Sequence, residues 1–236
     1  MKDEFERKLQ SIKNIVPSAA NEAIIRNLCH SLLNEAKYQD INNSFSLNLE
    51  KECYKVLDRL EREKIMSLSS EKFMPFYKYD FPLLIKNAVC ASDIFLSSPK
   101  HVFINAPYSP FYAVCSEKLI TRAVFEEAKY FYSKYKYATV KFSAEKKRFC
   151  FLLSVKATVN NQQYKINEEK TFSIMRKTAY IHGGTFLVKK SHRKEEHYLS
   201  IGNCFENETK YRRIPSYIDM LSDKMSSVYI ILGSSI

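Results

Sequence analysis

Residues 179–188 read Ala-Tyr-Ile-His-Gly-Gly-Thr-Phe-Leu-Val, and this stretch decides how the surrounding chain is organised. An amphipathic helix runs into His182, the pair Gly183-Gly184 stops it, and a β-strand begins directly afterwards. Only glycine adopts positive φ angles without a steric penalty, so two glycines after a helix are a strong stop signal. The whole chain holds four glycines. Two of them side by side therefore predict a tight helix-to-strand turn.

Length and composition place this turn in a folded protein of moderate size. A chain of 236 residues can bury one sizeable core, or a small helical module plus one domain. No apolar run approaches the length of a membrane span, and the start Met-Lys-Asp-Glu is not a signal peptide. We therefore expect a soluble cytoplasmic protein without membrane contact.

The cysteines and histidines do not follow a metal-binding pattern. The six cysteines lie far apart among apolar residues, at Cys29, Cys53, Cys90, Cys115, Cys150 and Cys204. Without a Cys-x-x-Cys pair they indicate reduced core thiols rather than metal ligands or disulfides. His101, His192 and His197 also lack ligand spacing. We expect no metal site.

The net charge of +11 leaves the class of partner open. Basic residues cluster in four stretches, at 134–141, 146–148, 189–194 and 210–213, and tyrosines interleave with several of them. Such a mixture is typical of a surface that follows phosphates and stacks on bases. An acidic protein partner fits the charge about equally well. The lysines are also explained by solvated strand edges, where they suppress aggregation.

The first 70 residues are predicted to form a helical module. Apolar residues lie at helical spacing in a second and a third helix, at Ile24, Ile25, Leu28, Leu32 and Ala36, and at Leu49, Cys53, Val56, Leu57 and Leu60. With a polar turn at 42–44 between them, they predict a helical hairpin. A hairpin cannot hide its own apolar stripe. It should therefore pair with a second copy or with the next domain.

Residues 71–210 show the pattern of an α+β domain. Helices are expected at 81–91, 117–134 and 171–182, and strands at 101–105, 111–114, 138–142, 149–155, 185–188 and 198–205. This order predicts a sandwich in which a mixed sheet packs on helices. Residues 211–236 form an extension with a short helix after Pro215. The apolar run 228–232 is predicted to be one more strand.

The helix that ends in His182-Gly183-Gly184, together with this order of elements, resembles the ATP-binding domain of bacterial histidine kinases, a GHKL-type ATPase fold. The upstream hairpin is similar to the dimerisation and phosphotransfer module of that family. The resemblance covers about residues 20 to 205. It implies an N-terminal hairpin followed by an α/β sandwich, and a place in two-component signalling.

The residues that hold the nucleotide in that family are not matched here. The family's long helix presents asparagines that hold Mg²⁺, but in this chain those positions fall on Arg122 and Glu126, or on Glu126 and Tyr130. After its central strand the family has Asp-x-Gly-x-Gly, in which the aspartate reads the adenine. The corresponding window, 156–161, contains Ala157 and neither aspartate nor glycine.

The family's phosphate turn is replaced as well. There, a Gly-x-Gly turn opens the helix that ends at His-Gly-Gly, and its N–H groups meet the phosphates. Counting back from Gly184 places Glu169 and Thr171 at the glycine positions, after a helix N-cap at Asn167. A carboxylate near a phosphate costs about 3 kcal/mol at an effective dielectric near 20. We therefore predict no ATP, no other cofactor, and neither kinase nor ATPase activity.

The remaining candidate for chemistry is His30, with Asn34 four residues later. His30 is predicted to face away from the stripe of the second helix, so its imidazole is accessible. The segment resembles the phosphoacceptor helix of kinases and phosphotransferases, except that Ser31 stands where that family usually has an acid. The resemblance implies a homodimeric histidine phosphotransferase, or a non-catalytic scaffold, for a response-regulator receiver domain or a sensor kinase. The alternative is a nucleic-acid-associated regulator that uses the basic, Tyr-rich surface.

Overall fold

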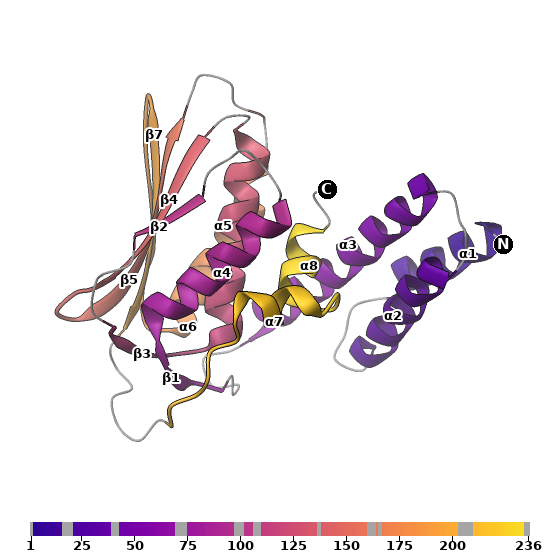
Figure 1. The fold of residues 1–236 in the computed structure, drawn as a ribbon, viewed down its shortest axis with the longest axis horizontal. Coiled ribbons are helices and arrows are strands. Elements are labelled where there is room, and N and C mark those ends of the chain that lie inside the picture. Colours follow the sequence, from indigo (N-terminus) through magenta and orange to yellow (C-terminus); the bar gives the residue numbers. More distant parts are fainter. Residues whose placement is uncertain are drawn as a thin grey trace.

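The computed structural model describes residues 2–15, 21–38, 43–68, 75–96, 102–105, 110–135, 138–159, 164, 167–202 and 210–233. Figure 1 shows a helical arm on one side and a sheet covered by helices on the other. The helices are α1 (Lys2–Asn14), α2 (Glu22–Tyr38), α3 (Asn43–Ser67), α4 (Phe81–Leu96), α5 (Glu117–Lys134), α6 (Glu168–Ile181), α7 (Tyr217–Ser222) and α8 (Ser227–Leu232). The strands are β1 (Tyr77–Asp80), β2 (Val102–Asn105), β3 (Tyr112–Cys115), β4 (Ala138–Lys146), β5 (Cys150–Val159), β6 (Phe186–Ser191) and β7 (Lys194–Gly202).

The main sheet is mixed, as the sequence predicted. Its strand order is β2-β4-β5-β7-β6, with β2 parallel to β4 and every other neighbouring pair antiparallel. A separate two-stranded sheet joins β1 to β3. The helices α4, α5 and α6 lie on the same side of the main sheet in Figure 1. The prediction of an α+β sandwich is confirmed.

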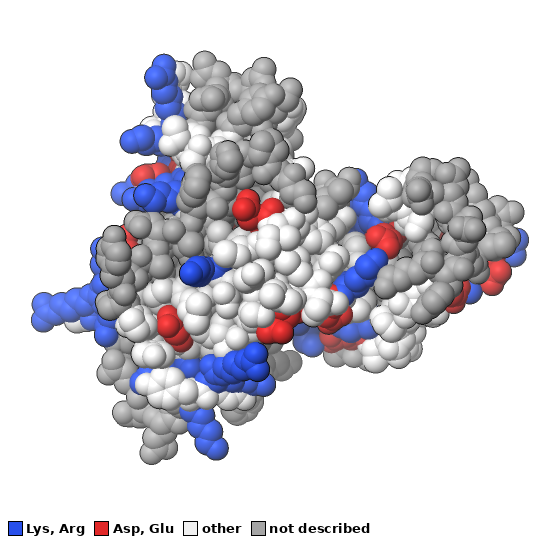
Figure 2. Space-filling view, in the orientation of Figure 1, with Lys and Arg blue, Asp and Glu red and all other residues white. Residues whose placement is uncertain are grey.

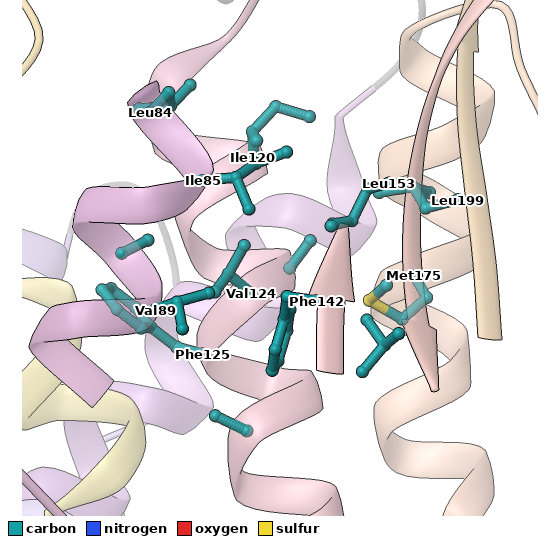
Figure 3. Close-up of a cluster of buried hydrophobic side chains, with 14 of the residues drawn as sticks. Leu84, Ile85, Val89, Ile120, Val124, Phe125, Phe142, Leu153, Met175 and Leu199 are labelled. Atoms are coloured by element: carbon teal, nitrogen blue, oxygen red, sulfur yellow. The ribbon is translucent and has the colours of Figure 1, made fainter. Parts of the chain in front are cut away.

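The main core lies between these helices and the inner face of the sheet (Figure 3). Strand β4 shows how the sequence builds it, because Val140, Phe142 and Ala144 alternate with more exposed residues and are all buried. The same core contains apolar residues at helical spacing on α4, α5 and α6: Leu84, Ile85, Val89, Ile120, Val124, Phe125 and Met175.

The apolar stripe of α2 differs from the one predicted. Ile24 is 52% exposed and Leu28 37% exposed, whereas Ile25, Cys29 and Leu32 are buried. The covering elements explain the difference, since α1 and α3 both pack against α2 and the stripe turns toward them. The side chain of Ala36 lies outside the described residues.

The apolar run 228–232 is a helix and not the predicted strand. Val228, Ile231 and Leu232 pack in the main core, while Ile230 packs in the core of the helical arm. A short apolar run looks the same whether it is a strand or a helix that is buried on two sides. Here α8 lies between the two cores and contacts α3, α4 and α5.

Several element boundaries also differ from the sequence expectations. Strand β1 was not predicted, β5 continues through Val159 instead of ending at Val155, and β7 begins at Lys194 instead of Tyr198. Each extension includes charged residues, Lys156 on β5 and Lys194, Glu195 and Glu196 on β7, and a search for apolar runs therefore misses it. Helix α3 begins inside the predicted turn, at Asn43. His101 and Cys204 lie outside the described residues. None of the described helices is long and apolar enough to cross a bilayer.

Candidate functional site

The His-Gly-Gly turn fixes the end of α6 against β7. Gly183 has φ of 64° and Gly184 continues into β6, with the Gly184 N–H donating to the carbonyl of Ala179 at 2.8 Å. A Cβ on Gly184 would lie 2.0 Å from the backbone oxygen of Ser200. The first glycine is therefore required by its conformation and the second by the close approach of the neighbouring strand.

His182 is buried in this turn and acts as a bridge. Its Nε2 accepts a hydrogen bond from the N–H of Ser116 at 3.0 Å, and its Nδ1 donates to the carbonyl of Thr178 at 2.7 Å. Burial lowers the pKa of His182 to about 4, and the bond to Thr178 offsets only part of that effect. The ring is thus neutral near pH 7, which fits one nitrogen that accepts and one that donates. His182 joins the end of α6 to the start of α5.

Glu126 is fully buried on α5, at the position that the resemblance assigns to a metal-holding asparagine. Both its carboxylate oxygens accept from Arg62 of α3, and one also accepts from Arg122 at 3.1 Å. Arg62 in addition donates to the carbonyl of Lys170 in the first turn of α6, at 2.9 Å. A single arginine from the helical arm thus spans the space between α5 and α6.

The same ion-pair network continues along α3. Arg122 donates to Asp58 and, at 2.8 Å, to Glu61, and Asp58 also accepts from Arg62 at 3.0 Å. Burial works against the charged form of Asp58, but Arg122 and Arg62 outweigh it and hold the pKa of this carboxyl below its usual range. Asp58, Glu61, Arg62, Arg122 and Glu126 are each 8% exposed or less. We call these five residues the arm network.

The first turn of α6 is also engaged with the rest of the chain. Its N-cap is Asn167, as predicted, and the Asn167 side chain accepts from the N–H of Lys170 at 3.4 Å. Glu168 accepts from Lys134 at 2.7 Å and from Lys190 at 2.6 Å. Glu169 points to solvent and pairs with Arg176 at 2.6 Å. Thr171 is buried at 9% exposure.

Between α5 and β7 lies a buried cluster that sequence reasoning missed. Nδ1 of His197 lies 2.7 Å from Glu127 and its Nε2 lies 3.2 Å from Glu195. Burial opposes the charged form of His197, but Glu127 and Glu195 outweigh it and raise its pKa to about 9. Tyr130 at 2.6 Å and Lys134 at 2.9 Å also donate to Glu195. The available signal was the alternation of β7, which places Glu195 and His197 on the same face as Leu199 and Ile201.

Ala157 lies inside β5 and not in a loop after it. It is buried at 2% exposure and opposes Val140 on β4 and Glu195 on β7. The expected strand end, where the resembled family reads adenine, is therefore a continuous part of the sheet. Residues 160 and 161 of that window lie outside the described residues.

His30 and Asn34 lie on α2, outside both of these buried clusters. His30 is exposed, and the Asn34 side-chain nitrogen lies 3.3 Å from Nε2 of His30. Ser31, which replaces the expected acid, donates to Glu35 at 2.9 Å. Within the described residues, no group of three or more His, Cys, Asp or Glu side chains is arranged to hold a metal ion.

The comparison with solved structures supports the fold. No protein-family model matches the chain, and a search of curated proteins gives no match either. Among solved structures, the Acinetobacter baumannii histidine kinase AdeS is similar, with a TM-score of 0.58 and 13% identity over 75% of this chain and 95% of that chain. Full-length ShkA in complex with AMPPNP is also similar, with a TM-score of 0.56 and 12% identity over 79% of this chain and 46% of that chain. The chain therefore has the histidine-kinase fold that its sequence predicted.

Proposed function

We propose that this chain is a cytoplasmic two-component or phosphorelay signalling protein that has the histidine-kinase fold and does not use ATP. The observation that carries the proposal is the arm network. Arg62 reaches from α3 to Glu126 on α5 and to the first turn of α6, and these are the two elements on which the resembled family holds metal and phosphates. In this chain, α5 and the first turn of α6 are instead hydrogen-bonded to Arg62.

The electrostatics of the α6 N-terminus support the same proposal. A triphosphate at this helix end would meet Glu168 and Glu169 before it met backbone N–H groups. To bind there, it would have to displace Lys134 and Lys190 from Glu168. Breaking buried or half-buried ion pairs leaves carboxylates uncompensated, which is costly. The histidine-kinase fold is retained and its nucleotide chemistry is not.

The chemistry left to such a protein is phosphotransfer on His30. In that step an imidazole nitrogen attacks the phosphorus of an aspartyl phosphate on a receiver domain. A P–N bond forms, the P–O bond to the aspartate breaks, and the carboxylate leaves. The exposure of His30 permits the in-line approach, and Asn34 is placed to hold the ring. A scaffold that binds a receiver domain or a sensor kinase without transfer is the other form of the proposal.

A thermal-shift titration tests the loss of ATP use. We expect the melting temperature with Mg-ATP to equal that with Mg²⁺ and sodium sulfate, because a ligand stabilises a protein only by binding its native state. An active histidine-kinase ATP-binding domain, treated in parallel, provides the positive control. A saturable rise in melting temperature with Mg-ATP alone would contradict the proposal.

Phosphotransfer is tested by incubating the chain with a phosphorylated receiver domain and measuring acid-labile phosphate on the chain. We expect His30→Gln to abolish labelling with an unchanged circular dichroism spectrum, and Asn34→Ala to slow it. His192→Gln, at another exposed histidine, is the matched control and should label normally. Labelling that persists in His30→Gln rules out the relay. In that case, retained receiver binding would leave the scaffold form as the function.

We also propose that the chain forms a homodimer through the exposed face of α2. The main stripe of the arm is covered within the chain by α1 and α8, but Ile24 and Leu28 remain exposed, which leaves an apolar surface for a second copy. Sedimentation velocity should show a dimer for the wild type and a monomer for Ile24→Glu/Leu28→Glu. A monomeric wild type at high concentration would contradict this.

A further inference from the structure

We propose that the outer face of the main sheet binds single-stranded nucleic acid, a function independent of phosphotransfer on His30. In the described part of the chain, the helices that contact the sheet, α4, α5 and α6, all lie on its inner side. The outer face is formed by the alternate residues of β4, β5, β7 and β6 that point away from the core. These outward residues of the four strands are called the outer face below.

A row of charges crosses the middle of the outer face. The strand registers place Lys141 opposite Lys156, Lys156 opposite Glu196, and Glu196 opposite Lys189. The three lysines are exposed, and only Glu196 carries the opposite charge. The ion pair of Glu196 with Lys156 is long, at 4.0 Å. The row therefore keeps an excess of positive charge on four adjacent strands.

An aromatic ring lies directly beside this row. Tyr198, partly exposed on β7, has the ammonium group of Lys189 at 5.5 Å and that of Lys156 at 5.8 Å from its ring centroid. A flat ring between two cations is the arrangement that stacks a base and holds its phosphates. An acidic protein surface would use the lysines but would not require the ring, so this pairing favours a nucleic acid.

Hydroxyl groups and further basic residues extend the surface along the strands. Thr139 and Thr158 lie on the outer face, and hydroxyls of this kind donate to phosphate oxygens. The β4–β5 hairpin ends in Arg148, whose guanidinium lies 4.9 Å from the ring of Phe149, which is 75% exposed. The β6–β7 hairpin, at the opposite end of the sheet, carries basic residues at 192–194.

The positive surface is therefore elongated along the strands rather than confined to one spot. Between the two hairpin tips, β5 runs from Cys150 to Val159, which at about 3.3 Å per residue is roughly 30 Å. Figure 2 shows lysines and arginines projecting along the margin where Figure 1 places the sheet, with fewer acidic side chains between them. A flexible single strand can follow such a surface, whereas a rigid duplex meets a twisted sheet at few points.

Fluorescence anisotropy with a labelled oligodeoxynucleotide of about 20 nucleotides and mixed sequence tests this proposal. The sheet variant is Lys141→Gln/Lys156→Gln/Lys189→Gln. The matched control, Lys55→Gln/Lys64→Gln/Lys86→Gln, removes the same charge from exposed lysines on α3 and α4. With a salt slope of about 0.7 per phosphate, three lost contacts reduce the slope by about 2. Between about 50 and 200 mM salt, the wild type should then lose about twentyfold more affinity than the sheet variant, and the control should behave as the wild type.

Substitutions of the ring separate stacking from charge. Tyr198→Leu should weaken binding about tenfold without changing the salt slope, while Tyr198→Phe should bind as the wild type. The proposal is overturned if no oligonucleotide binds at the lower salt concentration, or if the sheet variant and the control weaken equally. It is also overturned if polyglutamate competes as well as unlabelled oligonucleotide, because an acidic protein would then be the partner.

Discussion

At the scale of single residues, the same side-chain types serve opposite purposes in different places. His182 is neutral because it is buried beside one carbonyl, whereas His197 is charged because it is buried between two carboxylates. The two glycines also differ in their surroundings. A Cβ added to Gly183 would have no heavy atom within 4 Å, whereas a Cβ added to Gly184 would lie against the backbone of Ser200. The residue type alone predicts neither difference. Each results from the atoms that surround the imidazole ring or the glycine.

The two glycines provide a matched pair of substitutions. Gly183→Ala should cost about 1 kcal/mol of unfolding free energy, because only its positive φ opposes a side chain. Gly184→Ala should cost about 3 kcal/mol or more, because the new Cβ would force β7 away from the turn. Urea denaturation of both variants measures this order. A larger loss for Gly183→Ala would show that the turn does not hold the geometry described above.

His197 makes stability depend on alkaline pH. Its pKa of about 9 in the folded chain lies above the ordinary value near 6.5, so its contribution is complete below pH 6.5 and disappears as the pH rises through 9. Between pH 6.5 and pH 9, the unfolding free energy of the wild type should fall by about 3 kcal/mol more than that of His197→Leu. The difference between their unfolding free energies at the two ends of the window measures it. Equal pH profiles would contradict the buried ion pair.

The double variant His197→Leu/Glu127→Leu is the control for the ion pair itself. His197→Leu alone leaves Glu127 and Glu195 buried without the imidazolium, a loss of about 3–5 kcal/mol. Removing Glu127 as well should restore part of that stability, since the carboxylate left without a cation is then gone, whereas Glu195 keeps its ion pair with Lys134.

At the scale of elements, α3 and α5 are joined mainly by long polar side chains, beside a small apolar contact of Ile65 with Leu119. In the sequence, these polar residues look like solvated helix faces: Asp58, Glu61 and Arg62 on α3, and Arg122 and Glu126 on α5. Brought together, they form a buried set of ion pairs that joins positions about 60 residues apart. A buried network of this kind specifies one arrangement of its elements more than it adds stability.

The arm network predicts a clear contrast between two arginines of α3. Arg62→Met should cost about 3 kcal/mol and accelerate amide exchange in α5, because Glu126 and Asp58 lose a buried partner. Arg59→Met is the control. Arg59 is exposed and, among the described residues, its ion pair is with Glu63 on its own helix, so its loss should stay below about 0.5 kcal/mol. Hydrogen exchange measured by mass spectrometry gives both results, and equal effects would refute a specific role for Arg62.

The sequence predicts the secondary-structure elements better than it predicts the contacts between them. The His-Gly-Gly turn, the N-cap at Asn167 and the mixed sheet depend on local patterns, and these predictions are confirmed. The pairings of Arg62 with Glu126 and of His197 with Glu127 depend on packing between distant segments, which periodicity does not contain. The run 228–232 was misread for a related reason: its two buried sides belong to two different cores.

At the scale of the whole molecule, α8 makes the arm and the sheet domain depend on each other. Ile230 completes the core of the arm while its neighbours complete the main core, and Lys129 of α5 donates to the carbonyl of Ile231 at 2.8 Å. We expect a single cooperative unfolding transition that both parts share.

Ile230→Ala tests this dependence. It should cost about 2–5 kcal/mol and lower the midpoint of the arm and of the sheet domain together. Ile218→Ala on α7 is the matched control, because Ile218 is 61% exposed and should change stability little. Two separate transitions, detected by probes placed in the arm and in the sheet, would show that α8 does not couple them.

The position of α8 also determines when the chain can finish folding during synthesis. Lys224, just before this helix, pairs with Glu50 across 174 residues of sequence, and α8 itself is translated after every other helix and strand described here. Until it emerges, the apolar residues of α3 that it covers remain uncovered on the ribosome. We therefore expect the nascent arm to bind chaperones until α8 has been translated, and a translational pause before the codons of α8 to prolong that exposure.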